Sequence, residues 1–217
     1  MRSGTIIFGA VLAIVAITQL TTFDLWLSDR AYDFELGTWA VDHSSVWRPV
    51  FYDDPKALII AFALILIASV SRPAWLTRLR LSRREAIFLL LCLATVPAIV
   101  GLVRQHSRVS CPRTLQRYGG QIEDQFGHID PARFLRKAGP GRCWPSGYTS
   151  GGFALLCLAF LGRARRTRIN FAIFSLSIGG AMGAYQVLRG AHFASHIVVT
   201  MLMALALIQA IKLVMPE

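Results

Sequence analysis

The amino-acid sequence predicts an all-α membrane protein, a six-transmembrane-helix bundle built as a single domain over residues 1–217. Hydrophobic residues make up 54% of the chain and charged residues 16%, whereas an ordinary soluble domain carries about 25% charge. The apolar residues gather into long uncharged runs, and a bilayer core needs roughly 17–25 such residues per helix. Arginines collect in alternate connections between these runs, which is the pattern of a multi-pass membrane protein.

The expected spans follow the apolar runs in order along the chain. They cover residues 5–23, 57–70, 86–103, 151–162, 171–188 and 194–214. The second run can extend back toward Val50, and the fourth is lengthened if residues 145–150 open its helix. The first run has no clear small-residue cleavage site and exceeds the roughly 7–15 apolar residues of a signal peptide. We therefore interpret it as an uncleaved span.

The arginines also predict how the bundle is oriented. The second and fourth connections hold Arg72, Arg78, Arg80, Arg83, Arg84, Arg163, Arg165, Arg166 and Arg168. Short Lys/Arg-rich loops stay cytoplasmic, so both termini are expected there and the loops 24–56 and 104–150 are expected outside. Those two loops hold ten of the twelve acidic residues. The basic composition thus reflects topology, and it does not indicate a nucleic-acid partner, which would need a solvated basic face.

The four cysteines divide into two pairs. Cys92 and Cys157 lie inside apolar runs, where a thiol usually packs as a small hydrophobe. Cys111 and Cys143 lie in the second outer loop, and an oxidising compartment would allow them to form a disulfide. Such a bridge would contribute roughly 3–4 kcal/mol by closing the intervening loop. The alternative is a pair of free thiols too far apart to bond.

Polar residues suited to anion binding collect in segments 104–112, 141–152 and 186–196, which the predicted topology brings to one membrane face. Arginines make charge-assisted, bidentate contacts to phosphate oxygens. The candidates are Arg104, Arg108, Arg142 and Arg189. Ser146 and Gly147 precede the fourth span, where a helix N-terminus can direct N–H groups at an anion. Alternatively, such arginines anchor to lipid headgroups, and Pro-Ser-Gly is a simple turn.

Two histidines are the candidates for chemistry at this face. His192 is a plausible nucleophile that would take up a phosphoryl group as a phosphohistidine. His196 lies four residues on and shares a face with His192 if the stretch is helical, so it can orient the His192 imidazole. Alternatively, either ring is a hydrogen-bonded interface residue, or the two are ligands of a metal, with His106 as a third candidate. We expect no metal and no other cofactor.

These residues resemble the type 2 phosphatidic acid phosphatase superfamily, the lipid phosphate phosphatases. Arg104, separated by six residues from Cys111-Pro112, resembles its basic-x6-Arg-Pro part. The string Pro-Ser-Gly-Tyr at 145–148 resembles Pro-Ser-Gly-His, and His192 with His196 resembles the His-x-x-x-Asp end of the third part. The strings at 118–120, 150–153 and 189–193 resemble a bacterial branch of that family.

The resemblance implies a phosphatase of the bacterial inner membrane, with its active site at the periplasmic face and no metal or cofactor. Its substrate would be a lipid phosphate or pyrophosphate, presented among membrane lipids. His192 would be the nucleophile, Arg104 would bind the phosphate, and Ser146 and Gly147 would supply donors. Arg189 and Arg142 are further expected phosphate ligands. The sequence carries no signal for an oligomeric state.

Four departures from the family pattern bear on activity. Cys111 replaces one arginine, Gln186 stands at another arginine position with Arg189 three residues on as a substitute, and His196 replaces the orienting aspartate. Tyr148 replaces the histidine expected to protonate the leaving oxygen. A tyrosine has a reference pKa of about 10 against about 6.5 for histidine. Since general acid–base help is worth roughly 10²–10⁴-fold, we expect slow turnover.

Two other functions fit parts of the same pattern. One is a non-catalytic or weakly active lipid-phosphate binder or carrier on the same scaffold, which Tyr148 and Gln186 favour. The other is a small transporter without phosphate chemistry. A transporter would place charged residues at mid-span, and the interiors of the expected spans contain no Asp, Glu, Lys or Arg.

Overall fold

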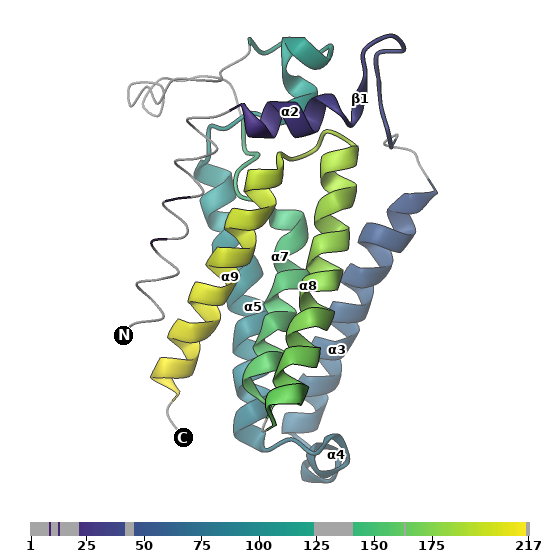
Figure 1. Cartoon of the computed structure of the whole chain (residues 1–217). Helices are drawn as coiled ribbons and strands as arrows, with labels where there is room; N and C mark the ends of the chain where they lie inside the picture. The colour runs from purple at the N-terminus through teal and green to yellow at the C-terminus, as the bar shows by residue number, and fades with distance from the viewer. Residues whose placement is uncertain are drawn as a thin grey trace.

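The computed structural model of the chain is an elongated helical bundle with a small cap lying across one end (Figure 1). It describes residues 9, 13, 22–41, 46–123, 141–162 and 164–215. The bundle consists of α3 (Asp54–Val70), α5 (Arg83–His106), α7 (Gly147–Ala154), α8 (Arg165–Leu188) and α9 (Ala194–Val214). The cap consists of α2 (Phe23–Asp29), the strands β1 (Tyr32–Asp33) and β2 (Thr38–Trp39), and the 3-10 turns η2 (Pro112–Thr114) and η3 (Gln116–Tyr118).

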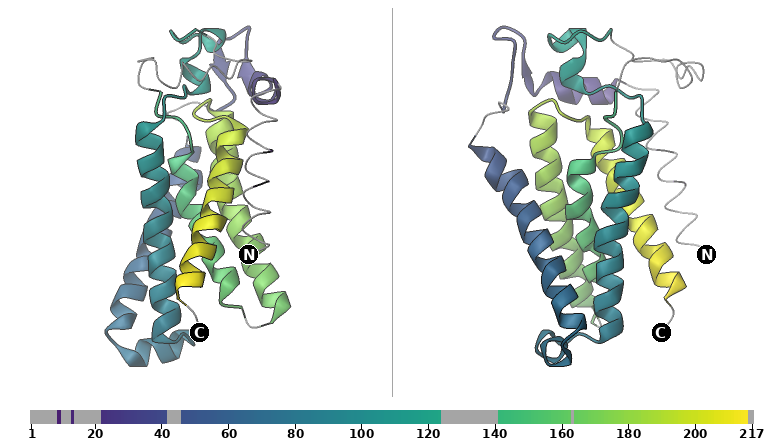
Figure 2. Two further views of the ribbon diagram at one scale, coloured as in Figure 1. Left: turned by 90° about the vertical axis from the view of Figure 1, so that its left-hand side faces the viewer. Right: turned by 180° about the vertical axis from the view of Figure 1, so that it is seen from behind.

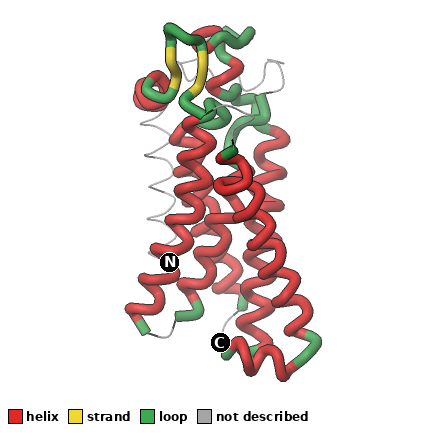
Figure 3. Tube along the Cα trace, turned by 90° about the vertical axis from the view of Figure 1, so that its right-hand side faces the viewer, coloured by secondary structure: helices red, strands yellow, loops and turns green. Residues whose placement is uncertain are grey.

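The predicted helical class is confirmed for the described residues, with one small exception. The strands β1 and β2 are two residues each and pair antiparallel, Tyr32 with Trp39 and Asp33 with Thr38. Figure 3 shows them at the cap, with helix throughout the rest of the bundle. The helices α3, α7, α8 and α9 lie at the positions of the second, fourth, fifth and sixth expected spans, and α5 at the third.

Three helices among the described residues are long and apolar enough to cross a membrane, namely α5, α8 and α9. Helix α3 has 17 residues and continues from the π-helical turn η1 (Pro49–Asp53). Helix α7 continues into the 3-10 segment η4 (Leu155–Phe160) and is a shorter apolar element. These helices indicate a membrane protein. The first expected span, 5–23, lies almost entirely outside the described residues, as do Arg163 and 124–140 of the second outer loop.

The end of the bundle opposite the cap carries the arginine-rich connections. Helix α4 (Pro73–Leu79) lies there between α3 and α5 (Figure 1) and was not expected from the sequence. The helix is followed by Arg80, whose φ of 54° is left-handed, as at many helix C-termini. Helix α5 then begins with a capping box, in which Ser82 Oγ accepts from the Glu85 N–H and Glu85 accepts from the Ser82 N–H.

The surface of the bundle is apolar where a lipid phase would surround it. Leu58, Leu64 and Ile67 of α3 are exposed, and so are Ile173 and Phe174 of α8. Exposed apolar surfaces of this extent mark an interaction with a membrane or a partner. The buried core lies between α5, α7, η4 and α9, and it includes Leu89, Val96, Phe153, Cys157 and Ile208.

Glycines allow α8 to pack closely against both α7 and α9 in the middle of the bundle. A Cβ added at Gly152 would lie 2.8 Å from the Cα of Gly179 in α8. A Cβ at Gly183 would lie 2.5 Å from the side chain of Ile197 in α9. Small residues at such crossings let helix backbones approach one another in membrane proteins. The close packing holds the start of α7 between the ends of α5, α8 and α9 near the cap (Figure 2).

The cap has its own small aromatic core, which the sequence analysis left undescribed. Leu115, Tyr118 and Phe193 are buried together, with Tyr32 and Trp39 packed against them. Arg117 donates to both carboxylate oxygens of Asp29, at 2.7 and 2.6 Å, and the Tyr118 hydroxyl donates to Asp29 at 2.9 Å. The Arg117 hydrogen bonds lower the pKa of Asp29. Phe193 joins this cluster to the residue beside it, His192.

Candidate active site

The three polar segments singled out from the sequence meet at the cap end of the bundle (Figure 2). Arg104 lies in the last turn of α5, Ser146 is the residue before α7, and His192 lies between α8 and α9. The helices bring these residues together because α5 runs toward the cap, α7 leaves it, and α8 and α9 turn beneath it (Figure 1).

A tight turn fixes the backbone of His192. The Gln186 carbonyl accepts from the N–H groups of Ala191 (2.9 Å) and His192 (3.2 Å). Gly190 has a φ of +64°, a conformation that glycine adopts most readily. A Cβ at Gly190 would also lie 2.2 Å from the Trp39 ring of the cap. The turn therefore needs a glycine here for two independent reasons.

The imidazole of His192 is 1% exposed and is enclosed by three side chains. Its Nδ1 lies 3.5 Å from Cys143 Sγ, and its ring centroid lies 5.9 Å from that of Tyr148 and 5.8 Å from that of His196. No hydrogen bond joins the His192 and His196 rings within the described part of the chain. Orientation of His192 by His196 therefore stays a prediction that rests on the contact of their rings, and Cys143 is the residue that lies beside Nδ1.

The surroundings of His192 favour its neutral form. Burial lowers the pKa of His192 well below its usual value, and the nearby His196 ring and the Arg104 and Arg113 guanidinium groups lower it further. A backbone hydrogen bond with Cys143 opposes this shift. A neutral imidazole has a free lone pair, which a nucleophile requires.

Arg104 is held in place at the start of α7. Its Nε donates to the Arg142 carbonyl at 2.8 Å, and its guanidinium carbon lies 5.5 Å from the centre of the Tyr148 ring. A Cβ added at Gly147 would meet the Arg104 side chain at 3.4 Å. The Tyr148 ring thus lies close both to the Arg104 guanidinium and to the His192 ring.

The other predicted phosphate ligands take different positions. The Arg142 side chain is exposed, and its contribution is the carbonyl that holds Arg104. The Arg189 guanidinium lies over the Tyr185 ring at 5.4 Å, and its buried Nε has no hydrogen-bond partner among the described residues. Arg108 is exposed. Arg113, which the sequence analysis did not select, is the second arginine whose charge acts on His192.

Two buried polar side chains near the helix ends have unpaired atoms. Ser146 is fully buried, and its N–H donates to Thr200 Oγ1 at 2.9 Å, so this N–H is committed within the protein. Its hydroxyl, in contrast, has no partner among the described residues, and neither has the amide group of buried Gln186. Buried polar groups normally find partners, so the Ser146 hydroxyl is suited to an anion.

Cys111 and Cys143 form a disulfide in the structure, with an S–S distance of 2.10 Å and their Cα atoms 5.3 Å apart. The bridge ties the segment after α5 to the segment before α7, and it carries the sulfur that contacts His192. Cys92 and Cys157 are free and buried within the bundle.

A cavity of about 500 Å³ opens beside Arg104 and Tyr148. Tyr52 and Lys56, from the start of the α3 segment, line its polar part together with these two residues. Lys56 Nζ lies 5.7 Å from the Tyr52 ring centre. Lys56 falls at the edge of the predicted outer loop 24–56 and was not selected from the sequence. Pro55 beside it, a residue favoured in the first helical turn, is the signal that could have placed the helix start here.

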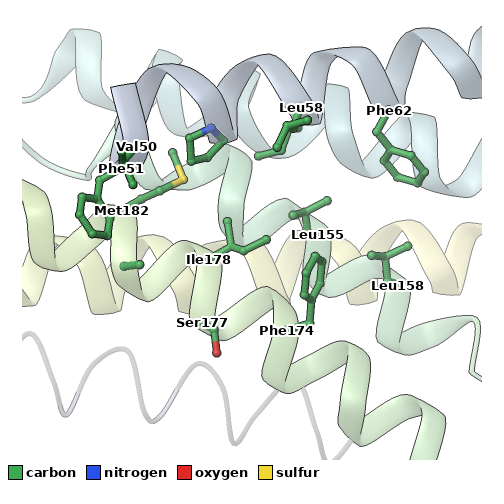
Figure 4. A pocket seen from close by; sticks show the side chains of 13 residues that line it. Val50, Phe51, Leu58, Phe62, Leu155, Leu158, Phe174, Ser177, Ile178 and Met182 are labelled. Atoms are coloured by element: carbon green, nitrogen blue, oxygen red, sulfur yellow. The ribbon is translucent and has the colours of Figure 1, made fainter. Parts of the chain in front are cut away.

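A second, apolar cavity of about 570 Å³ lies between α3, η4 and α8 (Figure 4). Leu58, Phe62 and Phe174 are among its lining residues. Ile59 and Met182 line both cavities, so the two are neighbours.

Asp24 of the cap holds the start of α9, and nothing in its local sequence indicated this. Its carboxylate is 4% exposed and accepts from the Ser195 N–H at 3.0 Å and from the Ser195 hydroxyl. Ser195 is in the first turn of α9, beside His196. Burial raises the pKa of Asp24, although both hydrogen bonds from Ser195 oppose the rise.

These features define a class of protein: a helical membrane protein that holds a neutral histidine and an arginine together at one end of its bundle. The family model of the PAP2 superfamily matches residues 85–217, a range that contains all three signature segments. The chain belongs to the PAP2 superfamily, which confirms the resemblance, and this membership indicates a phosphatase. Comparison with curated proteins and with solved structures gives no match.

Proposed function

We propose that the protein removes phosphate from a lipid phosphate or pyrophosphate at the periplasmic face of a bacterial inner membrane. The proposal places six spans in the membrane with both termini in the cytoplasm. The observation that carries it is the contact series Arg104, Tyr148 and His192, in which three separate elements supply an anion ligand, a proton donor and a nucleophile.

The contacts of His192 assign roles to its two nitrogens. Because Nδ1 faces Cys143 Sγ, Nε2 is the nitrogen that attacks phosphorus, and a P–N bond forms as the P–O bond to the lipid breaks. Arg104 holds the phosphoryl oxygens, with the Ser146 hydroxyl as a further donor. Tyr148 donates a proton to the leaving oxygen. Water then attacks phosphorus and gives a proton to the Tyr148 phenolate, and the P–N bond breaks to release phosphate and the neutral imidazole.

The two cavities support an amphiphilic substrate. The cavity beside Arg104 has polar groups from Tyr52, Lys56 and Tyr148, while its far part is formed by apolar residues such as Leu93. The neighbouring cavity is almost entirely apolar (Figure 4). A phosphate headgroup fits the first environment and an acyl or prenyl chain the second, because apolar surface gains about 25 cal/mol per Å² when it leaves water.

A non-catalytic lipid-phosphate binder is the second candidate, and one observation favours it. His192 does not line the cavity, whereas Tyr148 does, and the Tyr148 ring lies against His192. Phosphate bound at Arg104 would then meet Tyr148 before it reached the imidazole. In the phosphatase, the Tyr148 side chain must therefore turn aside or share the phosphate with His192.

The test is phosphate release from a panel of lipids by the purified protein in detergent. The panel contains phosphatidic acid, phosphatidylglycerophosphate, a polyprenyl pyrophosphate and lipid A. His192→Ala should abolish release, while His106→Ala should retain it, because His106 is exposed and its Nδ1 is bonded to the Leu102 carbonyl of its own helix. Release that is equal in both variants would exclude His192 as the nucleophile. If the unmodified protein binds these lipids but releases no phosphate, it is a non-catalytic lipid-phosphate binder.

A further inference from the structure

Cys143, His192 and His196 form a compact cluster of potential metal ligands. One ligand atom from each residue lies within 4.8 Å of the others, and the three residues are 0%, 1% and 3% exposed. Cys143 Sγ and His192 Nδ1 are 3.5 Å apart. A tetrahedral zinc ion, with Zn–S of about 2.3 Å and Zn–N of about 2.0–2.1 Å, holds sulfur and nitrogen about 3.6 Å apart. This pair already has the spacing of two zinc ligands.

His196 provides a second, independent observation. Its Nδ1 is buried and has no hydrogen-bond partner among the described residues. Leaving a buried polar atom unpaired costs roughly 1–3 kcal/mol, and a metal ion would supply the missing partner. His106, the third ligand considered from the sequence, is exposed and bonded to the Leu102 carbonyl. The third potential ligand beside His192 and His196 is Cys143 instead.

The disulfide determines whether this cluster can bind a metal. Zinc binds a thiolate, and Cys143 is bonded to Cys111 in the structure. We propose that reduction of the Cys111–Cys143 disulfide converts Cys143, His192 and His196 into a Zn²⁺ site, and that the bound ion withdraws His192 from catalysis. Metal binding stands without the proposed function, and only the inhibition rests on it.

The chemistry balances with a phosphine as the reductant. The phosphine gives two electrons to the disulfide and becomes a phosphine oxide, with oxygen from water, while Cys111 and Cys143 become thiols. The Cys143 thiol then releases its proton to the buffer as its sulfur binds Zn²⁺. Each imidazole binds through a ring nitrogen, and water takes the fourth tetrahedral position. In the oxidised protein the Cys143 sulfur is bonded to Cys111 and cannot become a thiolate.

Two serine variants separate the metal site from the loss of the disulfide. Cys111→Ser and Cys143→Ser both remove the bridge, so any loss of stability is matched, but only Cys111→Ser keeps a thiol in the cluster. Each full-length variant, purified without oxygen in detergent, is titrated with Co²⁺ and then with Zn²⁺. A cobalt–thiolate charge-transfer band in the near ultraviolet reports sulfur coordination directly.

We expect one cobalt–thiolate band per chain in Cys111→Ser, displaced by Zn²⁺, and no such band in Cys143→Ser or in the oxidised protein. Loss of a ligand should weaken Zn²⁺ binding by at least about 10–100-fold, the range seen even for outer-shell changes. The absence of the band in Cys111→Ser, or equal Zn²⁺ affinity in the two variants, would overturn the proposal.

A second measurement covers the case in which the variants do not fold. The unmodified protein is reduced with a phosphine and then alkylated with and without Zn²⁺, and the labelled peptides are compared. Zn²⁺ should protect Cys143 and leave Cys111 reactive, whereas equal labelling would contradict the site. In the lipid panel, Zn²⁺ should inhibit only proteins with a free Cys143 thiol. A cobalt band in Cys111→Ser, together with an oxidised, metal-free protein that releases no phosphate from any lipid, would refute the phosphatase and retain the metal site.

Discussion

Replacement of Asp24 by alanine should weaken both the bundle and its chemistry. Asp24 accepts two hydrogen bonds from Ser195 in the first turn of α9, and this turn also contains His196. Because the carboxylate is buried, water cannot take its place without entering the junction between the cap and the bundle. The variant leaves the Ser195 N–H and hydroxyl unpaired in a site that is 8% exposed.

The size of the effect follows from these contacts. Loss of a helix cap typically costs 0.5–2 kcal/mol, and each buried group left unpaired costs about 1–3 kcal/mol. Since both estimates count the Ser195 N–H, we expect a total loss of about 2–4 kcal/mol for Asp24→Ala. A shift of the α9 start by about 1 Å would also reduce phosphate release by roughly 10²-fold.

The assay is thermal unfolding in detergent at neutral pH, together with phosphate release. Asp29→Ala is the matched control, because Asp29 lies in the same helix but its ion pair with Arg117 is partly exposed. The Tyr118 hydroxyl, which also donates to Asp29, keeps a second acceptor in the Leu25 carbonyl at 3.5 Å. An exposed pair is worth about 0.2–1 kcal/mol, so the control should lose little stability and little activity. If the two variants behave alike, Asp24 does not hold α9, and the cap does not position the histidines.

Three further predictions concern the site itself. Tyr148→His should raise the rate of phosphate release, by up to the roughly 10²–10⁴-fold that general acid catalysis contributes. An unchanged rate would exclude Tyr148 as a weak general acid. Because the pKa of His192 is lowered, its imidazole stays neutral below the usual value of about 6.5. The rate should therefore persist as pH falls through 6.5 and decline only in more acid buffer, whereas a decline centred near 6.5 would indicate a solvated histidine. Mass spectrometry without reductant should detect a peptide that joins Cys111 to Cys143, and two free thiols would reject the bridge.

The bundle helices could be predicted because each membrane-spanning helix needs a long uninterrupted run of apolar residues, which is visible directly in the sequence. The runs ending at 188 and 214 end where α8 and α9 end. Helix α5 begins three residues before its apolar run, because the capping box of Ser82 and Glu85 carries charged residues into its first turn. Helix α4 was missed even though Pro73 begins it, since a seven-residue helix leaves no periodicity to detect.

The candidate site was predictable in its parts but not in its contacts. Arg104, Tyr148 and His192 were selected for their chemistry, and the helix ends bring them together. Asp24 and Ser195 are 171 positions apart in the chain. A local sequence pattern cannot predict a contact between residues so far apart. The contact of Cys143 with His192 is hidden for the same reason, because it depends on a turn after α8 packing against the segment before α7.

Trapping the phosphorylated protein tests the proposed phosphohistidine mechanism most directly. The purified chain is mixed with a lipid phosphate labelled at phosphorus, quenched in alkali to preserve a phosphohistidine, and digested for peptide mapping. If His192 is the nucleophile, the label appears on the peptide that contains His192, is lost in His192→Ala and is kept in His106→Ala. Steady phosphate release with no label on His192, or label that persists in His192→Ala, would contradict this mechanism.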